Sequence, residues 1–72
     1  MHSRIKKIVQ ALIRKYKTNN VYELARCLGI ILQIVPLGSY AGSYLYIKRR
    51  KIICLNSCLN EYERIIVLAH ER

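Results

Sequence analysis

The sequence predicts an α+β domain in which two N-terminal helices precede a small three-stranded sheet, antiparallel or mixed, and a C-terminal helix. Three observations predict it. Apolar residues recur at helical spacing near both ends, β-branched and aromatic residues gather in three central runs, and an Asn stands three positions before a Glu twice. The 72 residues, 53% of them hydrophobic, suffice for one small domain, which we take to span residues 1–72.

The two N-terminal helices follow from an apolar stripe and a cap signature. Residues 18–20 separate the helices. Asn20 followed by Glu23 fits a reciprocal N-cap, in which the Glu23 carboxylate would accept a hydrogen bond from the Asn20 backbone N–H. Gly29 stands where a left-handed residue would end the second helix. The first helix has a basic outer face, and its predicted inward stripe consists of Ile5, Ile8, Val9, Leu12, Ile13 and Tyr16.

Three strands are expected in the middle of the chain. Residues 30–35 are rich in β-branched side chains and stop at Pro36, which predicts a strand at a sheet edge. Residues 43–47 alternate in character, and residues 52–56 are the natural partner strand of a hairpin. The connection between them lacks Gly and Asn, which two-residue turns favour, so we expect a longer turn.

The last helix is predicted to begin after Asn60, because Asn60 and Glu63 repeat the cap signature. Val67 and Leu68 fall outside its predicted inward stripe, so the helix is apolar over more of its circumference than one buried face requires. We therefore expect a homo-oligomer, at least a dimer, or a protein partner to cover it. The stripe itself consists of Tyr62, Ile65, Ile66 and Ala69.

The helix ends on His70 and Glu71, which match the first half of a helical HExxH motif. Together with the order of the elements, this ending resembles the N-terminal part of the ImmA/IrrE family of metallopeptidases. The likeness covers nearly the whole chain, and four stretches carry it: residues 20–30, 42–47, 52–57, and 63–71 with their Leu-Ala-His-Glu ending.

The resemblance implies roles for both motif residues. His70 would be the position of the first zinc ligand and Glu71 that of the general base. Members of the family often occur in phages and mobile elements beside helix-turn-helix repressors, which they cleave. Arg72 follows the pair, and the second His and third ligand are missing, so we expect a shortened domain in which both residues are vestigial.

The expected function is therefore binding rather than chemistry. The sequence leaves catalysis open but favours a domain without independent peptidase activity, acting on a protein partner such as a helix-turn-helix repressor. No cofactor is expected, and zinc would bind only if another chain completed the site. A metal site joining Cys54, Cys58 and His70 was weighed against reduced thiols, which are the more frequent state in such a chain.

The charge supports an alternative function, that of a small basic regulator or inhibitor that binds nucleic acid or a nucleoprotein. Thirteen Lys and Arg stand against four acids, a formal charge of +9. At the expected hairpin tip, cations would contact phosphates beside stacking tyrosines on one strand face. The residues concerned are Lys48, Arg49, Arg50, Lys51, Tyr44 and Tyr46.

Other classes are excluded or disfavoured by simple counts. The three glycines are scattered, so no phosphate-binding loop exists, and the chain contains no Asp for a Ser-His-Asp triad. Apolar runs are far shorter than the roughly 20 residues that span a bilayer. We therefore expect a cytoplasmic protein with no membrane association.

Overall fold

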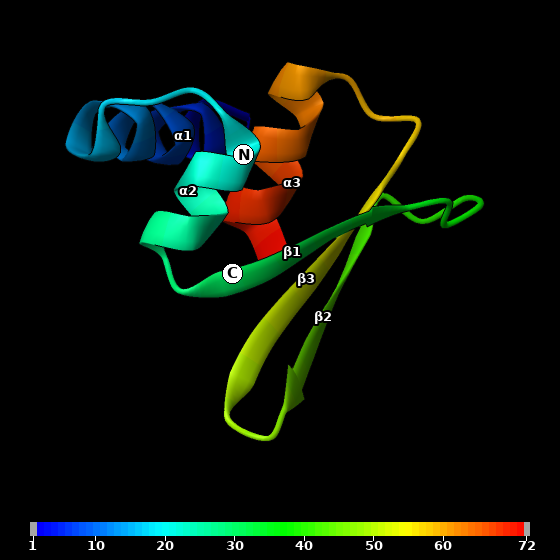
Figure 1. Cartoon of the computed structure of the whole chain (residues 1–72). Helices are drawn as coiled ribbons and strands as arrows, with labels where there is room; N and C mark the ends of the chain where they lie inside the picture. The colour runs from blue at the N-terminus through cyan, green and yellow to red at the C-terminus, as the bar shows by residue number, and fades with distance from the viewer. Residues whose placement is uncertain (1, 72) are drawn as a thin grey trace.

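The computed structural model describes residues 2–71 and confirms the α+β class (Figure 1). Two helices come first, the strands follow, and the chain returns to the helical layer at its end. In chain order the elements are α1 (His2–Tyr16), α2 (Val21–Cys27), β1 (Ile30–Val35), β2 (Gly42–Ile47), β3 (Arg50–Asn56) and α3 (Glu61–Glu71).

The sheet is mixed, with strand order β1-β3-β2. The central strand β3 runs parallel to β1 and antiparallel to β2. Strand β1 is therefore an edge strand, as the Pro36 that follows it predicts. The parallel pairing is possible because the β2 segment and its loop lie between β1 and β3 in the chain and give it room to return.

All three helices lie on one side of the sheet, and the core forms between them (Figure 1). Ile53 and Leu55 of β3 point into this core and are completely buried. Helices α2 and α3 contact the sheet, whereas α1 packs on α2 and α3. The opposite face of the sheet carries no helix of the described chain, and we call it the open face.

Most residues of both predicted helix stripes pack in or against the core, but a few positions differ from the prediction. On α1, Ile8 is exposed while Val9 and Leu12 are buried. On α3, Leu68 is fully buried and Tyr62 is half exposed, the reverse of the prediction. The reason is that α3 contacts α1, α2, β2 and β3 at once, so it buries a wider arc than a helix lying on a single surface.

The hairpin turn is also tighter than predicted. Ile47 pairs with Arg50, which leaves a turn of two residues, Lys48 and Arg49, with φ of 50° and 65°. This left-handed geometry matches the twist of the flanking strands, although each non-glycine residue pays about 1–2 kcal/mol for it. The continuous pairing of β2 with β3 outweighs that cost.

The helix caps follow the sequence signatures with one exception. Asn60 and Glu63 form the full reciprocal pair, since the Glu63 backbone N–H donates to Asn60 Oδ1 at 2.8 Å and the Asn60 N–H to Glu63 Oε1 at 2.9 Å. At α2, Asn20 Oδ1 accepts as predicted from two backbone N–H groups. The Asn20 N–H donates to Thr18 Oγ1 instead of Glu23, which was not predicted. Gly29 has the expected left-handed φ of 70°.

Candidate functional site

Two local features of α3 place the half motif. The reciprocal cap at Asn60 fixes where the helix begins, and Ile65 and Leu68 fix its rotation by burying in the core. With 3.6 residues per turn, His70 then faces away from the core and Glu71 lies at its margin. Accordingly His70 is exposed and Glu71 is half buried.

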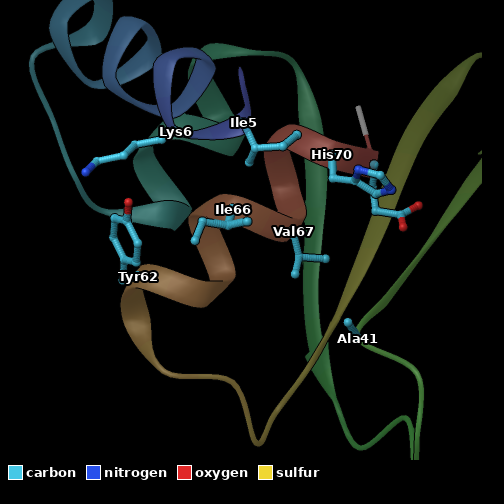
Figure 2. A pocket seen from close by; sticks show the side chains of 8 residues that line it. Ile5, Lys6, Ala41, Tyr62, Ile66, Val67 and His70 are labelled. Carbon is cyan, nitrogen blue, oxygen red and sulfur yellow. The ribbon is translucent and has the colours of Figure 1, made fainter. Parts of the chain in front are cut away.

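His70 lies on the wall of an apolar cavity of about 420 Å³ between α1, α3 and the segment that leads into β2. Figure 2 shows Ile5 and Lys6 entering it from α1, Ile66 and Val67 from α3, and Ala41 from the opposite side. The polar groups gather at the ends of the cavity, and its centre is hydrocarbon. The complete lining is Ile5, Lys6, Ala41, Tyr62, Ile66, Val67, His70 and Glu71.

A second hollow of about 300 Å³ is also lined by His70. Its lining includes Arg4, Ile8 and Ala69, and it shares Ile5 and His70 with the first cavity. The histidine therefore lines two apolar hollows, each of which also has a cationic side chain of α1 in its lining. Such a surface suits apolar side chains of another polypeptide better than a small polar ligand.

The residues at this site do not by themselves fit a catalytic zinc ion. Within residues 2–71, no three His, Cys, Asp or Glu side chains come close enough to hold a metal. Cys58 precedes the start of α3, so about 15 Å of helix separates it from His70. Cys54 is opposite Ser43 and Gln33 on the open face, while α3 covers the other face. The structure therefore does not bring these two cysteines together with His70, a metal site that the sequence analysis had disfavoured.

The basic candidates split between the two faces of the hairpin. Lys51 is opposite Tyr46 on the helix side, whereas Arg50 is opposite Ile47 on the open face. Tyr44 and Lys51 line a hollow of about 190 Å³ with two apolar neighbours from the segment after α2. Of the residues predicted to bind nucleic acid, the structure thus brings Tyr44 and Lys51 together in one hollow. At about 3.3 Å per residue, the tip lies about 20 Å along β2 from the end near α3.

Asn56 is a positioning residue that the sequence analysis missed. It is the one buried polar side chain among the described residues. Its Nδ2 donates to the carbonyls of Gly38 and Tyr40 at 2.9 and 2.8 Å, and its Oδ1 accepts the Cys58 N–H at 3.2 Å. It ties the loop before β2 to the entry of α3, and so shapes both walls of the cavity. A polar residue ending an apolar strand was the available signal.

Gly42 was also missed. A Cβ at this position would lie 2.7 Å from Val67 Cγ1 and 3.1 Å from the Cys54 carbonyl oxygen. The glycine therefore permits the close approach of α3 to β2, which brings Ala41 and His70 to the same cavity. This role depends on a contact between segments 25 residues apart, which no local pattern encodes.

Comparison with known proteins gives a consistent result. Residues 25–71 match the model of the IrrE N-terminal-like domain. The chain is also 47% identical over 70 residues to the "Uncharacterized immunity region protein 2" of Bacillus phage phi105, covering 93% of this chain and 43% of that protein. The chain thus spans less than half the length of that relative. No solved structure matches it. No helix within residues 2–71 meets the length and hydropathy required to traverse a bilayer.

Proposed function

Because the chain belongs to the IrrE N-terminal-like domain family, we propose that it is a regulator of the phage-immunity kind that acts by binding a protein such as a helix-turn-helix repressor. The observation that carries this proposal is the cavity beside His70. It is large enough for one or two apolar side chains, its lining is mainly hydrocarbon, and it lies where the family motif begins.

The proposal assigns these 72 residues no peptide hydrolysis of their own. By the resemblance described above, His70 and Glu71 would hold the positions of the first zinc ligand and the general base. A catalytic zinc takes three protein ligands, and one imidazole with one adjacent carboxylate does not supply them. The remaining ligands would have to come from residues outside this sequence, in the same polypeptide or in another chain.

Zinc titration of the purified 72-residue chain tests this part. We expect no stoichiometric binding by calorimetry, and no zinc retained after desalting. His70→Ala should behave as the parent does, and Cys58→Ser controls for binding by an exposed thiol. One tightly held zinc per chain, lost in His70→Ala and kept in Cys58→Ser, would overturn the proposed inactivity.

Partner binding is tested at the cavity wall. Ile66→Lys places a charge in the hydrocarbon centre and should weaken binding to a purified helix-turn-helix repressor from the same phage or element by about tenfold or more. Ile31→Lys makes the same change on the open face, far from the cavity, and should leave binding intact. Circular dichroism confirms that both variants fold. Equal loss in both, or cleavage of the repressor by the parent chain, contradicts the proposal.

A second candidate function is single-stranded nucleic-acid binding at the hairpin. It is favoured by the hollow that Tyr44 and Lys51 share, where a base could stack beside a cation. Fluorescence anisotropy with a labelled oligonucleotide should show affinity that falls with salt and drops in Lys51→Glu. Lys15→Glu, an equal charge change on α1, is the matched control. Absence of binding at low salt, or equal loss in both variants, eliminates this function.

A further inference from the structure

Strand β2 has a free edge. It is the outer strand of the sheet and pairs with β3 alone among the described elements. Ile47 and Arg50 close the two-residue turn, and the Asn56 N–H donates to the Ala41 carbonyl at the other end at 2.9 Å. Because hydrogen-bonded pairs alternate in antiparallel strands, the backbone groups of Tyr44 and Tyr46 point away from β3 and are left without a strand partner.

Within residues 2–71, nothing gives this edge the protection that is usual in natural sheets. Folded proteins place charges, Pro, bulges or covering segments on exposed edge strands. The residues of β2 include neither a charge nor Pro, and its last five residues are exposed, with Leu45 at 45% and Tyr46 at 61%. The other edge differs, because β1 ends at Val35 directly before Pro36 and is contacted by α2.

The chemistry of the edge fits a second copy of the same chain. A twofold axis perpendicular to the sheet pairs a strand with its own copy in the antiparallel direction and keeps both helical layers on one side. The basic tip of each copy, Lys48 and Arg49, would then lie beside the start of the other copy's β2. There Ala41 and Glu71 line one cavity, so the cations approach a carboxylate. The two tips stay about 20 Å apart, more than twice the Debye length of about 8 Å at physiological salt.

We propose that β2 is a self-association edge, at which a second copy adds its own β2 antiparallel and the two sheets become one of six strands. Leu45 and Ile47 of both copies would form one continuous apolar strip on the open face, and the outward backbone groups of Tyr44 and Tyr46 would be paired. The inference rests on the edge and its charges and does not depend on the proposed repressor binding or on any metal.

Sedimentation equilibrium of the 72-residue chain tests the proposal with a matched pair of variants. Leu45 and Ile31 flank Ile52 in one row of the open face, on the two edge strands. We expect a dimer at tens of micromolar, and Leu45→Lys should weaken it by about tenfold or more, since an edge Lys is the ordinary protection against pairing. Ile31→Lys should leave the dimer unchanged.

Hydrogen exchange supplies a second readout. The amides of Tyr44 and Tyr46 should be protected in the dimer and exposed in Leu45→Lys. Ser43→Lys adds the charge at an exposed polar position without removing an apolar side chain, so it serves if Leu45→Lys does not fold. A monomeric parent chain overturns the proposal, as does equal weakening by Ile31→Lys, which would indicate stacking of open faces. Protection of the amides only on adding a foreign extended peptide overturns it as well.

Discussion

Asn56→Ala is predicted to destabilise the protein far more than an ordinary Asn→Ala change. The substitution removes three hydrogen bonds, to the carbonyls of Gly38 and Tyr40 and from the Cys58 N–H. At about 1 kcal/mol net for each bond, the loss is about 3 kcal/mol. The three partner residues are exposed overall, but the bonds themselves are part-buried, so any partner that water does not reach would add to this loss.

A loss of about 3 kcal/mol is a large share of the free energy of unfolding of so small a protein. A chain of 72 residues has a free energy of unfolding of about 4–11 kcal/mol, at about 0.05–0.15 kcal/mol per residue. Urea unfolding followed by circular dichroism should therefore show a lower midpoint for Asn56→Ala with an unchanged slope. The loop before β2 should also exchange its amide protons faster, because it loses its attachment to the entry of α3.

Asn20→Ala is the matched control for this experiment. Its Oδ1 accepts two backbone N–H groups at an exposed helix cap, for which loss of the side chain costs about 1 kcal/mol. If Asn56→Ala costs no more than Asn20→Ala, the three bonds of Asn56 do not hold the loop, and the account of how the cavity walls are positioned is refuted.

Two further predictions concern backbone geometry. Replacing Lys48-Arg49 by Asn-Gly should raise the free energy of unfolding by about 1–2 kcal/mol in urea titrations. Both residues have a left-handed φ, which Asn and Gly adopt more readily. An unchanged free energy of unfolding would mean that the turn does not have this left-handed geometry. Gly42→Ala should cost about 1–3 kcal/mol through overpacking against Val67. Val67→Ala should recover part of that cost in a double-mutant cycle, and strict additivity of the two changes would contradict the close contact.

The sequence predicted the kinds of elements and their order because those depend on neighbouring residues. The Asn60–Glu63 cap, the left-handed Gly29 and the edge position of the strand before Pro36 are all local, and the structure contains each one. The family resemblance was likewise carried by short ordered stretches and is confirmed by the match over residues 25–71.

Prediction from the sequence was less accurate where several surfaces compete for one side chain. Leu68 was placed outside the stripe of the last helix because a single buried face was assumed, whereas α3 packs on two helices and two strands. The turn at Lys48 was judged by propensity, which strand pairing overrode. The roles of His70, Glu71 and the basic tip remain predictions that the experiments above address.

By itself the sequence determined three helices, three strands, a strongly basic surface and a half motif on the last helix, since periodicity, caps and charge are properties of adjacent residues. Tertiary structure alone decided that β3 is central, that Ala41 and Ile5 meet His70 around one cavity, and that β2 lies at an edge of the sheet formed by residues 2–71. These features depend on which distant segments pack together, and that choice is made by the burial of the whole core rather than by any local run of residues.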